Sequence, residues 1–172
     1  RSLPARIRRR GLRGASARAL QRTLRIPLTF LATRVLRRRM RRISSIDDAL
    51  NVAYGFSFAG IQFNPWQERS EIDGLLRMVA AIDPTTVLEI GTSNGGSLFL
   101  FACVASANAL LVSIDLPHGQ FGGGYPPWRS VLYRAFATRK QRIKLMRADS
   151  HEATTLEEAR VALEGRQVDV LF

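Results

Sequence analysis

Residues 87–101 read V-L-E-I-G-T-S-N-G-G-S-L-F-L-F, and the predicted fold rests mainly on this segment. An apolar strand carries Glu89 near its end and breaks at Gly91, and a short turn then leads into an apolar helix. A strand, turn and helix of this kind direct backbone N–H groups and a helix N-terminus toward a polar ligand. A second apolar run, residues 110–114, ends in Asp115, and an acid there suits a ribose diol. The two features together predict a nucleotide-type cofactor site.

The turn departs from the dinucleotide-binding fingerprint at two positions. The fingerprint G-x-G-x-x-G requires glycine at positions 91, 93 and 96, but Ser93 stands at the second. Glu89 is the other departure, because a carboxylate at the end of an apolar strand needs a polar or cationic partner. The ammonium group of S-adenosylmethionine (SAM) offers such a partner. An NAD-dependent oxidoreductase remains the alternative, and an ordinary turn that binds no ligand is the third interpretation.

The spacing E-x-G-x-x-x-G, here Glu89, Gly91 and Gly95, resembles the first motif of the class I SAM-dependent methyltransferases. Over residues 71–172 the chain is most similar to the branch labelled cephalosporin-hydroxylase-type or family 24 methyltransferases. The similarity lies in E-I-G-T-S-N-G-G-S, in V-S-I-D-L-P with the following G-G-G-Y, and in R-A-D-S-H. Ser93 suits this branch, although many class I members have glycine there. The resemblance implies a SAM-binding Rossmann-like domain that methylates a small-molecule acceptor, with O-methylation expected.

The resemblance also implies which residues hold the cofactor. It places the methionine part of SAM near the glycine turn, the ribose on Asp115 and the adenine beside Asp149. Asp149 has a second interpretation, as a cap of the helix that follows it. The cofactor-binding residues that we expect are Glu89, Gly91, Thr92, Ser93, Asn94, Gly95, Ser97, Asp115, Leu116, Asp149 and Ser150.

The catalytic group is less well indicated than the cofactor site. His151, beside Asp149 and Ser150, is the candidate base or metal ligand, and His118 is a weaker one. The glycine-rich residues 119–127 are a candidate wall or lid of the acceptor site, with a surface turn as the plainer interpretation. The resemblance implies a divalent metal such as Mg near the acceptor, and it predicts the acidic metal ligands beyond Phe172. We therefore expect a fragment that is inactive by itself, whose sheet would continue through about three more strands.

Charge is distributed very unevenly along the chain. Residues 1–46 hold 15 arginines and no acid, whereas the remainder holds 11 basic residues against 14 acids. The basic leader fits an anionic membrane surface, a solvated extension or transit segment, or nucleic acid. Nucleic acid is disfavoured because Phe30 is the lone aromatic residue there, and Pro27 argues against one unbroken helix. The apolar residues at helical spacing are Leu20, Leu24, Leu28, Leu31 and Val35.

The order of the predicted elements indicates an α/β fold, the N-terminal half of a Rossmann-like doubly wound sheet with about four strands. We divide the chain into a leader (1–46) that is helical or disordered, a transition segment (47–70) and a partial SAM-binding domain (71–172).

No segment is expected to span a membrane. The expected location is cytoplasmic, or peripheral to a membrane. A noncatalytic, surface-attached scaffold is a further alternative to the enzyme. Strands are predicted at 86–90, 110–114, 143–147 and 168–172, and helices at 71–82, 94–106, from Pro126 or Pro127, and from a Thr155-x-x-Glu158 capping box to Gly165.

Overall fold

A computed structural model describes residues 25–117, 124–138 and 140–172. Within these ranges the strands form one parallel sheet of four strands in the order β3-β2-β1-β4. This order, with a helix in each crossover, is the first half of a doubly wound Rossmann-like fold, so the predicted fold class is confirmed. The strands are β1 (Thr86–Ile90), β2 (Leu110–Asp115), β3 (Arg142–Arg147) and β4 (Val170–Leu171).

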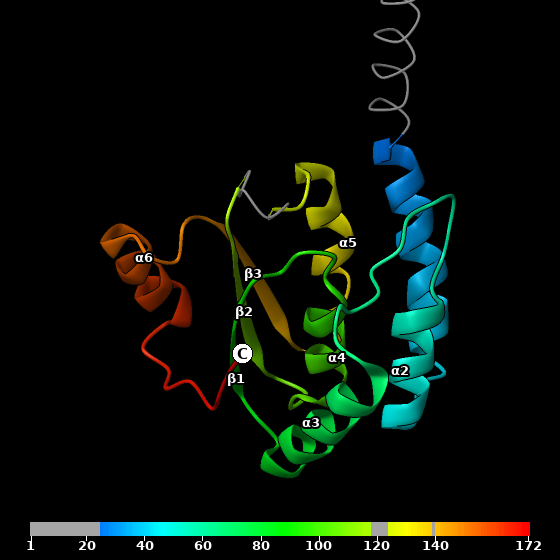
Figure 1. Ribbon diagram of the computed structural model, residues 1–172, viewed down its shortest axis with the longest axis horizontal. Helices are drawn as coiled ribbons and strands as arrows, with labels where there is room; N and C mark the ends of the chain where they lie inside the picture. Colours follow the sequence, from blue (N-terminus) through cyan, green and yellow to red (C-terminus); the bar gives the residue numbers. More distant parts are fainter. Residues whose placement is uncertain (1–24, 118–123, 139) are drawn as a thin grey trace, which may run out of the picture.

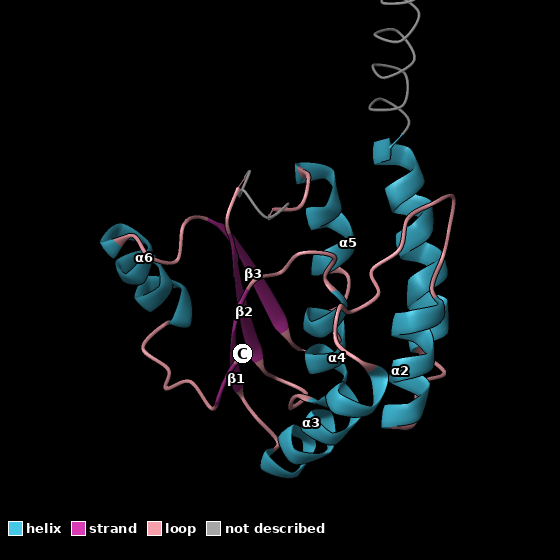
Figure 2. Cartoon of the chain, in the orientation of Figure 1, coloured by secondary structure: helices cyan, strands magenta, loops and turns pink. Residues whose placement is uncertain are grey.

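Helices cover the two faces of the sheet unequally. Figure 1 shows α6 on one face and α4 and α5 on the other, with α2 and the helix over residues 25–40 forming an outer layer beyond α4. Figure 2 shows the same arrangement, in which α3 packs beside α2 and α4. The helices are α2 (Ile46–Gly55), α3 (Arg69–Ile82), α4 (Gly96–Val104), α5 (Ser130–Arg134, preceded by the 3-10 turn Pro127–Arg129) and α6 (Ala153–Leu163).

Most predicted boundaries hold within two residues. Strand β1 has its predicted bounds, β2 extends by one residue to Asp115, and α3 begins two residues before the predicted start. Apolar runs bounded by glycine, proline and acids define these elements locally, which explains the agreement. The transition segment (47–70), for which no element was predicted, holds nearly all of α2, and Ser45 and Asp48 form a capping box at the start of this helix.

The capping box predicted for the last helix is wrong. Thr155 lies inside α6 and is buried, and Glu152 is the N-cap residue, without a side-chain cap. The helix begins earlier because the Thr155 N–H already bonds to the Glu152 carbonyl. The end of the helix agrees better with the prediction, since Gly165 and the preceding Glu164 both have positive φ.

The described part of the basic segment packs onto the domain. Residues 25–40 form a helix in which Ala32 and Leu36 are fully buried in the common core. Pro27 lies within this helix, so the expected interruption does not occur over residues 25–40. The hydrogen bond that a proline lacks would reach back four residues, to position 23, which is outside the described helix. Leu20 and Leu24 also lie outside the described residues.

Helix α4 lies at the centre of the core. Residues 96–102 are all buried, because the sheet covers one side of the helix and α2 and α3 cover the other. Phe99 packs against Phe63 and Phe136, with ring centroids 4.9 and 5.3 Å away. Burial raises the pKa of the Cys103 thiol on this helix to about 12, and its side chain packs against the core.

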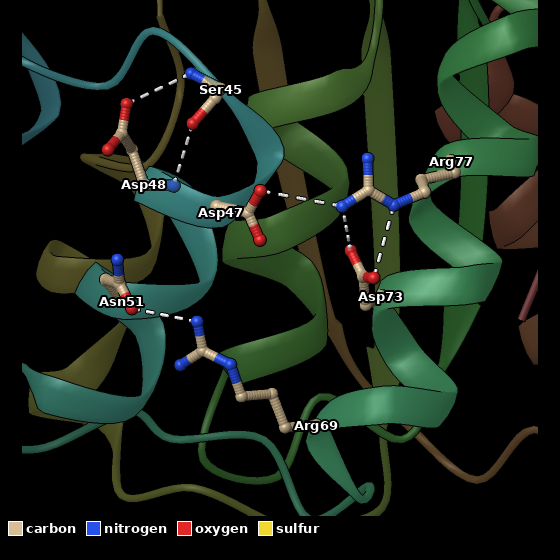
Figure 3. Close-up of polar contacts among 7 residues, drawn as sticks. All are labelled: Ser45, Asp47, Asp48, Asn51, Arg69, Asp73 and Arg77. Atoms are coloured by element: carbon tan, nitrogen blue, oxygen red, sulfur yellow. Dashed lines mark hydrogen bonds and ion pairs between the residues drawn. The ribbon is translucent and has the colours of Figure 1, made fainter.

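Polar side chains join α2 to α3 on the outside of the molecule (Figure 3). The Arg77 guanidinium lies 3.0 Å from Asp73 on its own helix and 3.6 Å from Asp47 on α2. Arg69 donates a 2.8 Å hydrogen bond to the Asn51 side chain. Exposed pairs of this kind contribute little stability, so the apolar contacts beneath them hold the outer helix layer in place. No helix among the described residues is long and apolar enough to cross a membrane.

Candidate functional site

The carboxyl ends of three neighbouring strands meet at one edge of the sheet. Gly91, just after β1, donates a 2.7 Å hydrogen bond to the Ile114 carbonyl, and Ala148, just after β3, donates a 3.0 Å bond to the Asp115 carbonyl. The chain leaves β1 through α4 on one face and reaches β4 through α6 on the other. Open α/β sheets bind ligands where the strand order reverses in this way, and Gly91 lies at that position.

The turn after β1 uses three left-handed residues. Gly91, Ser93 and Gly95 have φ values of +104°, +43° and +83°. A Cβ atom on Gly91 would meet no described residue within 4 Å, so this side of the turn is open in the described part of the chain. A Cβ atom on Gly95 would lie 2.6 Å from the ring of Tyr133, so that side is closed by α5. A ligand therefore has room at the Gly91 end of the turn.

The amino end of α4 is covered by another part of the chain. A Cβ atom on Gly96 would collide with the backbone of Asn64 and Pro65, which crosses directly over this position. Only glycine permits so close an approach of two backbones. The N-terminus of this helix is therefore shielded at Gly96, and a cofactor would approach the turn from the side of Gly91.

Glu89 is fully buried and held by hydroxyl groups. Its carboxylate accepts one hydrogen bond from Ser97 Oγ and another from Ser113 Oγ, each 2.5 Å long. Burial raises the pKa of Glu89 to about 7, while the two serine hydrogen bonds act in the opposite direction. The polar partners that we expected for Glu89 are thus two serine side chains of the protein itself.

Ser113 is a site residue that the sequence reasoning missed. Its hydroxyl lies 2.6 Å from Thr92 Oγ1, so Thr92, Ser113 and Glu89 form one buried chain of hydrogen bonds. Ser113 interrupts the apolar run of β2 before Asp115 and pairs with Glu89 in the parallel register. A polar residue within this apolar run could have been noticed in the sequence, but it is recognised as the partner of Glu89 only when the register of the two strands is known.

Asp115 connects the end of β2 to the glycine turn. Its carboxylate accepts a 3.1 Å hydrogen bond from the backbone N–H of Ser93, and its side chain is largely buried. Burial raises the pKa of Asp115, although hydrogen bonds from the backbone N–H groups of Ser93 and Gly124 oppose the shift. The structure thus brings together the two features that the sequence predicted to act jointly. Leu116, the next residue, is exposed beside them.

Asp149 lies in a turn after β3 and does not cap α6. Its carboxylate accepts a 2.9 Å hydrogen bond from the backbone N–H of His151 and lies 3.1 Å from His151 Nδ1. These contacts, led by the backbone hydrogen bond, lower the pKa of Asp149. Ser150 is half-buried between them, and the His151 side chain is exposed. His118 lies outside the described residues, as do residues 119–123 of the predicted acceptor wall.

Two residues near α5 hold the turn from outside, and the sequence analysis missed both. The Tyr133 hydroxyl donates a 2.8 Å hydrogen bond to the Ser93 carbonyl. Arg129 donates to the Asn94 carbonyl at 3.4 Å and to the Tyr133 hydroxyl at 3.3 Å. Burial raises the pKa of Tyr133, so its hydroxyl remains a donor. No local pattern links these residues to a turn about 40 positions earlier.

The expected cofactor residues thus fall into two groups. Glu89, Thr92 and Ser97 are buried behind the turn, where they stabilise its conformation. Gly91, Asp115 and Asp149 lie at the carboxyl ends of three adjacent strands, where a cofactor could contact them. Among the described residues, no group of three or more His, Cys, Asp or Glu side chains could hold a metal ion. No protein-family model matches the chain, and no curated protein matches it.

Proposed function

We propose that this chain binds SAM and belongs to a cytoplasmic methyltransferase that methylates a hydroxyl group of a small-molecule acceptor. One observation carries the proposal: the open Gly91 and the carboxylate of Asp115 lie at the carboxyl ends of adjacent strands, and Ser93 links them directly. The likeness of E-x-G-x-x-x-G to the first motif of class I methyltransferases supports the choice of SAM.

The residues at the edge suit the parts of SAM. The missing side chain of Gly91 leaves room for the methionine part, and Asp115 can accept hydrogen bonds from ribose hydroxyls. Asp149 follows β3, the strand next to β2, and would lie beside the adenine. SAM supplies a methyl group on a positively charged sulfur, so its leaving group is already activated.

The protein's own part in the reaction is positioning and proton removal. The Thr92–Ser113–Glu89 chain and the Tyr133 hydroxyl hold the turn from its two sides, so the cofactor site is formed before the ligand arrives. Asp149 holds the ring of His151 at Nδ1, which leaves Nε2 to accept a proton from the acceptor hydroxyl. A divalent metal such as Mg near the acceptor remains part of the proposal by resemblance.

Calorimetric titration of SAM into the chain tests the proposal. We expect binding by the unchanged protein and an affinity at least about tenfold lower for Asp115→Asn, which keeps an acceptor for the Ser93 N–H but loses the charge. Asp115→Ala should lower the affinity at least as much. Asp83→Asn is the matched control, because Asp83 precedes the opposite end of β1, and it should bind as the unchanged protein does.

Other outcomes separate the alternatives. If NADH binds in place of SAM and Asp115→Asn weakens it, the site belongs to an NAD-dependent oxidoreductase, which shares the strand order and the acid after β2. If a folded protein binds neither compound, the methyltransferase proposal fails. A noncatalytic scaffold then fits best, with Glu89 and Asp115 satisfied by internal hydrogen bonds.

A further inference from the structure

The helix over residues 25–40 has two faces of different character. Its inner face buries Ala32 and Leu36 in the core. Its outer face exposes three large apolar side chains, since Ile26, Phe30 and Leu31 are 53%, 55% and 48% exposed. A shallow surface cavity brings Phe30 and Leu31 together with other residues of the same helix, Pro27, Thr33, Arg34 and Arg37. Exposed apolar side chains grouped in this way mark an interaction surface.

Arginines flank this apolar surface. Residues 25–42 carry seven arginines, and the chain has no acid before Asp47. Among the residues that the structure describes, none of these arginines forms an ion pair with a carboxylate. Two of them stack on rings instead, Arg25 on Trp128 at 5.6 Å and Arg39 on Phe56 at 5.3 Å. Arg34 and Arg37 remain exposed beside Phe30 and Leu31.

From this combination we infer that the outer face of the helix over residues 25–40 binds the surface of an anionic lipid bilayer. A bilayer offers both complements at once, because anionic headgroups pair with the arginines and the acyl boundary accepts Phe30 and Leu31. Nucleic acid would satisfy the charge but would offer little to aliphatic side chains such as Ile26 and Leu31.

The structure also changes which residues would enter the lipid. The leucine periodicity of the sequence includes Leu28 and Val35, but both side chains pack against the core. The lipid-facing set is instead Ile26, Phe30 and Leu31. Because Leu36 and Ala32 already anchor the opposite side, the surface exists before any membrane is met.

Flotation of the full chain with lipid vesicles tests the inference. We expect binding to phosphatidylcholine vesicles that contain about 30% phosphatidylserine and little binding to phosphatidylcholine alone. The double variant Phe30→Ser/Leu31→Ser should bind at least about tenfold more weakly, and Arg34→Gln/Arg37→Gln should also lose affinity. Met78→Ser/Ile82→Ser is the matched control and should bind as the unchanged protein does, because those α3 side chains are 63% and 59% exposed elsewhere.

Three results would overturn the inference. The first is equal binding to neutral and anionic vesicles, and the second is no binding to either. The third is unchanged binding by Phe30→Ser/Leu31→Ser, which would mean that charge alone carries the interaction. The third result would be supported if single-stranded RNA displaced the unchanged protein and Phe30→Ser/Leu31→Ser from the vesicles equally well, because charge would then account for the binding of both. The variants used for the vesicle test leave Gly91 and Asp115 unchanged. Their SAM affinity can therefore be measured separately, and failure of one proposal does not imply failure of the other.

Discussion

Ser113 lies directly opposite Glu89 in the parallel pairing of β1 and β2, and its hydroxyl donates a 2.5 Å hydrogen bond to the buried Glu89 carboxylate. With Ser97 on the other oxygen, the two hydroxyls stabilise an acid that has no access to water. Thr92 extends the chain of hydrogen bonds into the glycine turn. A buried acid thereby becomes part of the support for the candidate cofactor site.

The pKa of Glu89 predicts how stability varies with pH. Burial raises it from 4.5 to about 7, so the folded protein holds a proton that the unfolded chain releases between these values. The contribution of Glu89 to the free energy of unfolding is therefore fully present below about pH 4.5 and is lost as pH rises through about 7. The free energy of unfolding should differ by on the order of 3 kcal/mol between the two ends of this range. Glu89→Gln can keep both serine contacts and removes the titration.

Urea unfolding at about pH 5 and about pH 8 measures this effect. Glu89→Gln should gain stability relative to the unchanged protein as pH rises. Glu157→Gln, a change at an exposed position of α6, is the control and should follow the unchanged protein at both pH values. Parallel profiles for Glu89→Gln and the unchanged protein would show that Glu89 does not titrate in this range.

Two glycines with opposite surroundings provide a matched stability test. Gly96→Ala would push a Cβ atom into the backbone of Asn64 and Pro65, so we expect a loss of roughly 2 kcal/mol or more in the free energy of unfolding. Gly74 lies in the exposed interior of α3 with nothing within 4 Å, and Gly74→Ala should stabilise by roughly 0.5–1 kcal/mol. Similar effects for both variants would contradict the close crossing at Gly96.

The packing of the helix over residues 25–40 can be tested with two leucines. Leu36 is fully buried, so Leu36→Ala should lower the free energy of unfolding by about 2–5 kcal/mol. Leu31 lies half-exposed on the outer face, and Leu31→Ala should change it by about 0.5 kcal/mol or less. If Leu36→Ala is as mild as Leu31→Ala in urea unfolding, the helix is not part of the domain core.

Removing the Tyr133 hydroxyl should loosen the glycine turn. Tyr133→Phe loses the hydrogen bond to the Ser93 carbonyl, which costs roughly 1 kcal/mol of stability, while the ring stays over Gly95. We also expect weaker SAM binding in calorimetry, because the turn is less ordered before the ligand arrives. Tyr54→Phe is the control, since its hydroxyl bonds to the Gln67 carbonyl near α2 and should affect stability alone. Equal SAM affinities for the two variants would separate Tyr133 from the cofactor site.

Local signals in the sequence were sufficient to predict the strands and the turn between β1 and α4. Thr86–Ile90 and Leu110–Asp115 are mostly apolar, and Gly91 and Asp115 mark where the two apolar runs end. Such signals act over a few neighbouring residues, so they survive without knowledge of the rest of the chain. They also placed Gly91 and Asp115 at a common edge, because parallel strands end on the same side.

Tertiary packing decided what surrounds that edge. Tyr133 reaches Ser93 across 40 positions, and Asn64 and Pro65 cover Gly96, although no local pattern connects these segments. Packing also determines which face of the basic helix is buried, since Leu28 packs against the core whereas Leu31 is exposed, although both belong to the same helical periodicity. Contacts between distant segments follow from strand register and side-chain packing, and neither is encoded in the spacing of one stretch of sequence.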